Sequence, residues 1–147
     1  MLNLLKNILK NKNSLEEEED VSNLELLCGL MVEAAYTDGH IDKIELDKIK
    51  TSLVNTFEEN QNEVDLVLDK AINNKNNSKS LYQYTSFINK NFTEDKKLIL
   101  IEALWEIVLS DGNIHDYESS LIRRLAGLLY ISDVNSGNAK RKALNKI

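Results

Sequence analysis

A short acidic motif occurs twice in this sequence, and its residue types could bind a hard cation. Both copies follow the pattern Asp-Gly-x-Ile-x-x-x-Glu, which runs from Asp38 to Glu45 and again from Asp111 to Glu118. Carboxylates on a turn and on the first turn of the next helix supply the oxygen ligands that Ca²⁺, Mg²⁺ and Mn²⁺ prefer. If the two copies pack symmetrically, these four carboxylates meet, and the sequence predicts a divalent-cation site there.

The same motif also has a purely structural interpretation. Gly39 can adopt the left-handed conformation that ends one helix, and Asp42 can be the N-cap of the next helix. Glu45, three residues later, would then complete a capping box. In the second copy His115 stands where the first has Asp42, so the capping explanation is weaker there. The spacing leaves both interpretations open.

Two other metal sites fit the sequence poorly. The motif is similar to the second half of an EF-hand loop, but positions one and three of that loop would fall on residues without a carboxylate in both copies. The two histidines, His40 and His115, do not occupy equivalent positions in the repeat. We therefore expect neither an EF-hand nor a symmetric histidine-based zinc site.

The elements that must position these residues are helices. The chain has no proline and few glycines, and its apolar residues recur at helical spacing. The expected helices are residues 21–37, 43–58, 60–73, 81–92 and 93–110, one that passes through Leu121 to Tyr130, and one from Ser132 or Asp133 towards Ile147.

A shift of 73 residues superposes the two motifs and the apolar faces of the helices before them, which indicates an internal duplication. We expect an all-α bundle of two pseudo-symmetric helix-turn-helix units. Glu33 and Glu106 correspond under this shift, and both are expected to be solvated because they lie opposite the apolar stripe.

The N-terminal residues form a separate region in this prediction. Residues 1–13 fit an amphipathic helix that either packs on the body or a partner, or lies on an anionic membrane surface. A run of five acids at positions 16–20 follows and suits a linker. The predicted organisation is residues 1–20 as this helix and linker, and residues 21–147 as the helical domain.

Composition excludes several function classes. A net charge of −6 at pH 7 argues against nucleic-acid binding. No apolar run is long enough to span a membrane. The single cysteine, Cys28, lies on an apolar stripe and is expected to be buried. We find no nucleophile paired with a base and no glycine-rich phosphate loop, so we expect no enzymatic activity.

The doubled motif, preceded by Ala34-Ala35 in the first copy and followed by Leu125-Ala126 in the second, resembles the TerB-like (tellurite-resistance protein B-like) family over about residues 23–144. The resemblance implies a compact, cytoplasmic bundle of about seven helices, a relation to the N-terminal region of a DnaJ-type membrane co-chaperone, and roles in metal chelation and stress responses. It adds Asp42 to the expected metal ligands, which become Asp38, Asp42, Glu45, Asp111 and Glu118.

We therefore expect a non-enzymatic stress-response domain that binds a divalent cation (Ca²⁺, Mg²⁺ or Mn²⁺) through these acids and has protein partners. The alternative is a metal-free helical adaptor of co-chaperone type that contacts proteins or the inner face of the membrane.

Overall fold

The computed structural model describes residues 23–36, 40–73, 80–113 and 115–146. Within these ranges the regular elements are helices and no strand is formed, which confirms the all-α prediction. The helices are residues 23–35, α2 (Lys43–Thr51), the π-helix η1 (Ser52–Thr56), α3 (Gln61–Asn73), α4 (Leu81–Asn91), α5 (Glu94–Val108), α6 (Asp116–Leu128) and α7 (Asp133–Asn145). The amphipathic helix and linker predicted for residues 1–20 lie outside the described residues.

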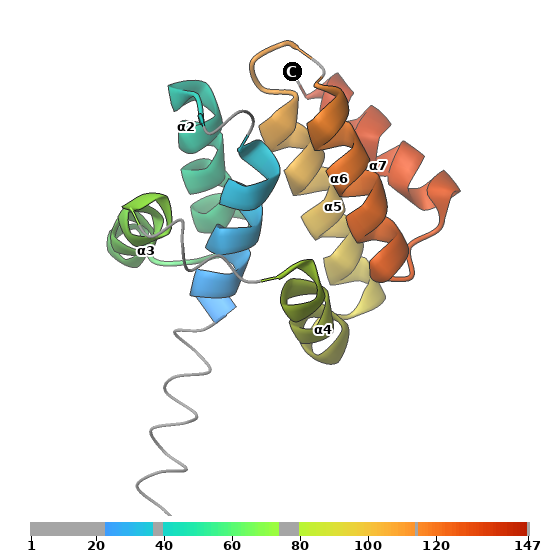
Figure 1. The fold of residues 1–147 in the computed structure, drawn as a ribbon, viewed down its shortest axis with the longest axis horizontal. Coiled ribbons are helices and arrows are strands. Elements are labelled where there is room, and N and C mark those ends of the chain that lie inside the picture. The colour runs from blue at the N-terminus through green and yellow to red at the C-terminus, as the bar shows by residue number, and fades with distance from the viewer. Residues whose placement is uncertain (1–22, 37–39, 74–79, 114, 147) are drawn as a thin grey trace, which may run out of the picture.

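The helices form two groups that pack side by side. Residues 23–35, α2 and α3 make up one group, and α5, α6 and α7 make up the other, with α4 at the base between them (Figure 1). Helix α5 packs against α6 and α7 in its own group and against α2 in the other. Helices α2 and α6 begin, and α5 ends, at the same end of the bundle (Figure 1). The fold therefore brings the starts of both second helices together.

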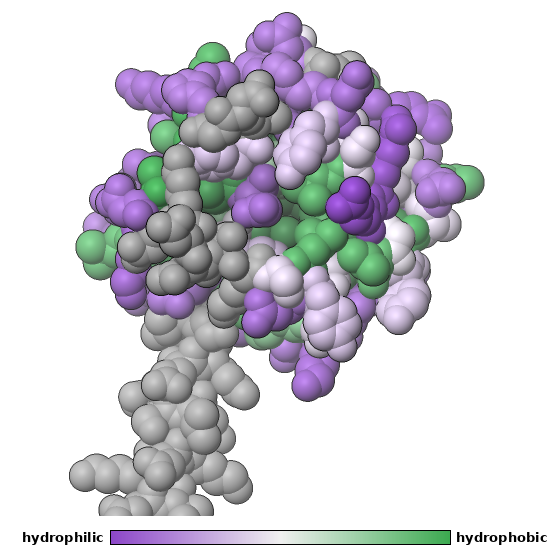
Figure 2. All heavy atoms as spheres, in the orientation of Figure 1, coloured by the Kyte–Doolittle hydropathy of each residue, from purple (hydrophilic) through white to green (hydrophobic). Residues whose placement is uncertain are grey.

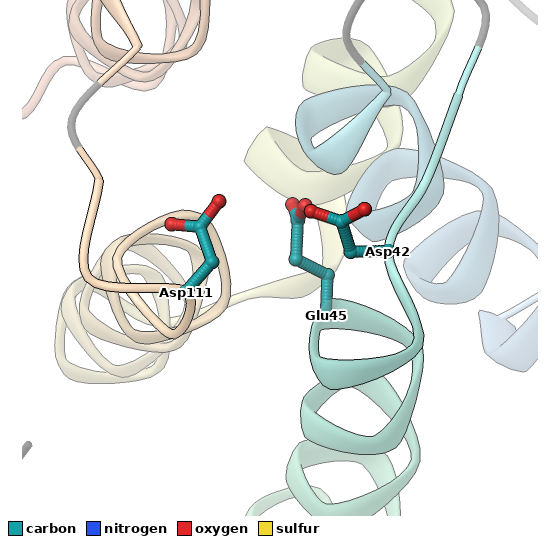
Figure 3. A group of neighbouring side chains, drawn as sticks. All are labelled: Asp42, Glu45 and Asp111. Carbon is teal, nitrogen blue, oxygen red and sulfur yellow. The ribbon is translucent and has the colours of Figure 1, made fainter.

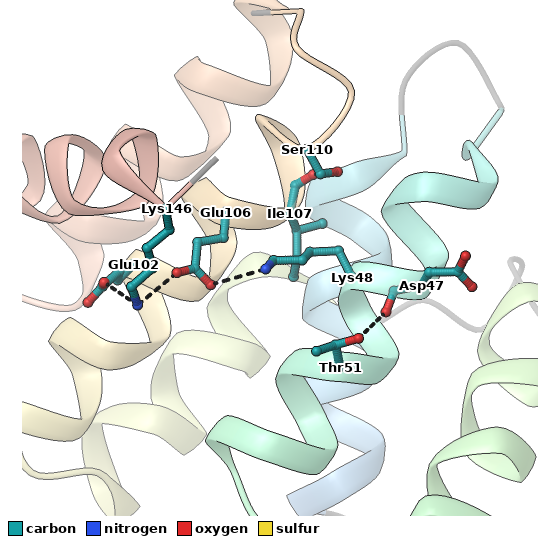
Figure 4. Close-up of polar contacts among 8 residues, drawn as sticks. All are labelled: Asp47, Lys48, Thr51, Glu102, Glu106, Ile107, Ser110 and Lys146. Carbon is teal, nitrogen blue, oxygen red and sulfur yellow. Dashed lines mark hydrogen bonds and ion pairs between the residues drawn. The ribbon is translucent and has the colours of Figure 1, made fainter.

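Helix α5 is the central helix of the bundle. Every residue from Ala103 to Val108 is buried, because other helices pack on all its sides. The expectation that Glu106 is solvated is therefore wrong: its residue surface is only 7% exposed. Its carboxylate lies 2.9 Å from the Lys146 ammonium and 3.9 Å from that of Lys48, so α5 is tied by charge to the C-terminal end of the chain and to α2 (Figure 4).

Two helices of the second half of the chain begin where the sequence predicted, at Thr93 and at Ser132 or Asp133. Thr93 and Ser132 are N-caps, and their hydroxyls accept hydrogen bonds from the backbone N–H groups of Lys96 and Asn135. The predicted continuous helix over residues 43–58 is wrong in detail. Helix α2 ends at Thr51 and continues as η1, a wider turn whose π-type bond joins residues 57 and 52. Amphipathic spacing does not distinguish these two helix types.

The face of the molecule drawn in Figure 2 is mostly hydrophilic. Figure 2 shows an apolar area near the middle of one face, with hydrophilic side chains around it. Leu66, Tyr82, Tyr130 and Val134 are the most exposed large apolar side chains. No described helix combines the length and apolar character needed to cross a membrane. Cys28 is fully buried, as its place on the apolar stripe predicts.

Candidate metal centre

The first helical turn of α2 places two carboxylates. Asp42 is the N-cap of α2 and has the extended backbone of a cap residue, but its side chain makes no capping hydrogen bond. The backbone of Asp42 lowers the pKa of the Glu45 carboxyl group, which lies at the third position of the helix. The predicted capping box is therefore not completed, and the Asp42 carboxylate is not engaged at the helix end.

The turn between α5 and α6 holds the third carboxylate. Gly112 has a φ of 79°, a left-handed conformation that glycine adopts without strain. The backbone N–H of Asn113 donates to Oδ1 of Asp111 over 2.9 Å, and Nε2 of His115 lies 3.3 Å from Oδ2. The Asp111 side chain is only 10% exposed. The turn thus fixes this carboxylate in one orientation.

These carboxylates converge from the two halves of the chain. One carboxylate oxygen from each of Asp42, Glu45 and Asp111 lies within 4.8 Å of the other two. Figure 3 shows the side chains of Asp42 and Glu45 on one side and that of Asp111 on the other, with their oxygens directed to a common region. Glu45 is only 2% exposed, and its Oε2 is buried without a hydrogen-bond partner among the described residues.

Two predicted ligands, Glu118 and Asp38, are not among these three acids. Glu118 is 1% exposed, and its charge acts on Glu45, so it belongs to the same electrostatic environment. It does not belong to the group of three whose oxygens converge. Asp38 lies outside the described residues.

The carboxylates of the cluster repel one another, and this repulsion changes the pKa values of neighbouring groups. Burial is the largest cause that raises the pKa of Glu45, followed by the negative charges of Glu118, Asp111 and Asp42. Together, and against a lowering by the Asp42 backbone, they bring this pKa from 4.5 to about 7. The pKa of His115 is also raised, first by its hydrogen bond to Asp111 and then by the charges of Glu118, Asp111 and Glu45. Both pKa shifts have a common cause, the excess of negative charge around Asp111 and Glu118.

The donor set fits a divalent cation. It offers oxygen atoms from three carboxylates, the ligand type of Ca²⁺, Mg²⁺ and Mn²⁺, at separations that one ion can bridge. The buried, unpaired oxygen of Glu45 is unfavourable in a folded protein unless something binds it. Asp42 adds a carboxylate that makes no capping bond.

Sequence reasoning undervalued the two histidines. It set them aside because they are not equivalent in the repeat, yet each lies beside an acid of the cluster: Nε2 of His40 is 3.4 Å from Oδ1 of Asp42, and Nε2 of His115 is 3.3 Å from Oδ2 of Asp111. The available signal was local, since each histidine stands within four positions of its acid.

A family comparison agrees with the fold and the doubled motif. Residues 24–141 match the family described as tellurite resistance protein TerB, and the chain belongs to this family. The match confirms the resemblance inferred from the sequence but does not support the relation to DnaJ-type co-chaperones. No curated protein and no solved structure matches the chain.

Proposed function

We propose that this TerB-family domain binds a divalent cation between its two halves through Asp42, Glu45 and Asp111. The carrying observation is the Glu45 carboxylate, which is buried, has an unpaired oxygen and faces the two other acids. Glu118, and Asp38 from the same motif, are proposed to strengthen the negative field of the site. The role is binding rather than catalysis.

A bound cation would change the energetics of the bundle. Its charge would offset the repulsion that raises the pKa of Glu45. It would also connect the start of α2 with the α5–α6 turn, because Asp42 and Glu45 come from the first and Asp111 from the second. Ligand that binds only the folded state adds about 2.7 kcal/mol at a concentration one hundred times its Kd. The proposed function is therefore a cation-dependent stabilisation of the contact between the two halves, on which partners of a stress-response protein could depend.

Calorimetric titration of the chelator-treated chain tests this proposal. We expect saturable binding of Ca²⁺, Mg²⁺ or Mn²⁺ and a higher melting temperature in the presence of the ion that binds. Asp111→Asn should weaken both effects strongly, because it removes a charge while keeping the hydrogen bond from Asn113. Asp116→Asn is the matched control, since Asp116 is exposed on the first turn of α6 and lies outside the cluster.

Two results would reject the proposal. One is the absence of heat and of thermal stabilisation with every ion at millimolar concentration. The other is binding that Asp111→Asn and Asp116→Asn weaken equally. The first result would favour a metal-free adaptor domain.

A further inference from the structure

The two histidines of the chain flank the acidic cluster from both halves. His40 precedes α2 and its Nε2 lies 3.4 Å from Asp42, whereas His115 precedes α6 and its Nε2 lies 3.3 Å from Asp111. Each histidine is thus next to one of the three carboxylates that converge. Figure 3 shows these three carboxylates. This arrangement does not follow from the repeat, in which the two positions differ.

Neither imidazole belongs to the buried core of the described residues. His115 is the N-cap of α6 but makes no side-chain capping bond. The side chain of His40 is 79% exposed and that of His115 is 42% exposed, so neither ring is enclosed in the protein. Among the described residues, their side chains make polar contacts with Asp42 and Asp111. Both rings can therefore turn towards an ion without loss of core contacts.

The separations are those of neighbouring ligands on one ion. Two atoms bound to the same ion at about 2.1 Å lie roughly 3.0 to 3.4 Å apart in octahedral or tetrahedral geometry. The nitrogen–oxygen distances of 3.3 and 3.4 Å are within this range. Each histidine can therefore share an ion with its own acid. Neither ring nitrogen is in the group of three converging ligand atoms, so both rings must turn towards that group to reach the same ion.

We propose that His40 and His115 are nitrogen ligands of the cation site, and that the site is selective for a divalent transition-metal ion over Ca²⁺ and Mg²⁺. This inference rests on the proposed function, because it needs an ion held by Asp42, Glu45 and Asp111. Imidazole nitrogen suits Zn²⁺, Ni²⁺, Co²⁺ and related ions, whereas Ca²⁺ and Mg²⁺ take oxygen ligands. Carboxylates alone would bind many divalent cations, whereas the two histidines favour a transition-metal ion.

Affinity alone does not test this proposal, since transition-metal ions bind most sites more tightly than Mg²⁺ does. The informative quantity is the change in the ratio of Co²⁺ to Ca²⁺ affinity when both imidazoles are removed. The full chain, freed of metal by a chelator, is titrated with Co²⁺ and with Ca²⁺ as wild type and as the double variant His40→Gln/His115→Gln. The control is Lys43→Gln/Asp116→Asn, which alters exposed neighbours of both turns without changing the net charge.

The double variant is expected to lose roughly tenfold to one-hundredfold in Co²⁺ affinity, the size of effect seen when groups around a metal are removed, and to keep its Ca²⁺ affinity. The control should behave as the wild type. Equal losses for the two ions, or no loss for Co²⁺, would overturn the assignment of the histidines while leaving the carboxylate site in place. Failure of the wild-type chain to bind either ion would overturn the cation site itself, and the inference with it.

A second measurement uses only the wild-type chain. The ring nitrogens of ¹⁵N-labelled histidine are followed by NMR while Zn²⁺ is added to saturation. Direct ligation predicts large shifts of one nitrogen in each ring at one equivalent of Zn²⁺. Saturation of the site with unshifted ring nitrogens would show that the histidines act only as neighbours of the acids, and would refute the proposal.

Discussion

Replacing Glu45 by glutamine should stabilise the metal-free protein. The gain in stability should appear only at pH values at which Glu45 is ionised in the wild type. The pKa of Glu45 rises from 4.5 to about 7 because the side chain is buried beside three other acids. Since one pKa unit is equivalent to about 1.36 kcal/mol, ionised Glu45 costs the folded protein about 3 kcal/mol. Glutamine removes the charge and keeps the size of the side chain and one of its oxygen atoms.

The pH dependence has a definite sign. Between pH 4.5 and about 7 the folded state binds a proton that the unfolded state has released, so the stability of the wild type falls as the pH rises through this range. Below pH 4.5 both states carry the proton and the variant gains little. Above pH 7 the full penalty applies, and Glu45→Gln should be more stable than the wild type by about 3 kcal/mol.

Urea denaturation of chelator-treated protein at pH 4.5 and pH 8 measures this difference. Circular dichroism follows the helices, and fluorescence of the single, buried Trp105 follows the core. Asp47→Asn is the control, because it removes an exposed charge from the same helix. If Glu45→Gln is no more stable than the wild type at pH 8, or if its gain is the same at both pH values, the reasoning about a repulsive cluster is refuted. With a saturating cation the order should reverse, because the variant loses a ligand.

The remaining predictions concern the site and the backbone around it. Cation affinity should fall as the pH is lowered from 8 to 6, because Glu45 must release its proton to bind; a pH-independent Kd in calorimetry would contradict this. Gly29→Ala should destabilise the fold by about 1 kcal/mol, since the new Cβ would lie 2.8 Å from the hydroxyl of buried Tyr84. Gly137→Ala, with no atom within 4 Å of the new Cβ, should instead stabilise α7 by about 0.5–1 kcal/mol, and the opposite signs in thermal unfolding are the check. Gly112→Ala should cost about 1 kcal/mol because of its positive φ, and an unchanged unfolding midpoint would argue against that strain.

The sequence predicted most of the fold because helix formation and capping are local. The apolar spacing located the helices, and the sequence placed the start of α5 at Thr93 and that of α7 at Ser132 or Asp133, where the structure has the N-caps Thr93 and Ser132. The burial of Glu106 could not be predicted in this way. The stripe of α5 indicates its most apolar face, but whether the opposite face is covered depends on how α2 and α7 pack, which the helix itself does not encode.

The candidate site shows the same division between local and long-range information. The internal repeat predicted that acids of the two motifs meet, and the structure brings Asp42, Glu45 and Asp111 together. The sequence assigned Asp42 a capping hydrogen bond that it does not make. The Asp42 carboxylate could either cap α2 or bind a metal ion, and the sequence does not distinguish these two roles. The structure does, because this carboxylate lies near Asp111 from the other half of the bundle. The metal role of all five acids stays a prediction.

The convergence of Glu45 and Asp111 also bears on how fast the protein unfolds. The two residues are far apart in the sequence, so an ion between them would act as a reversible cross-link that closes a long loop of chain. Such a cross-link forms only after both halves have docked, late in folding. We therefore expect the ion to slow unfolding and to leave the folding rate almost unchanged. Cellular metal availability would then set the lifetime of the folded domain rather than the speed at which it is made.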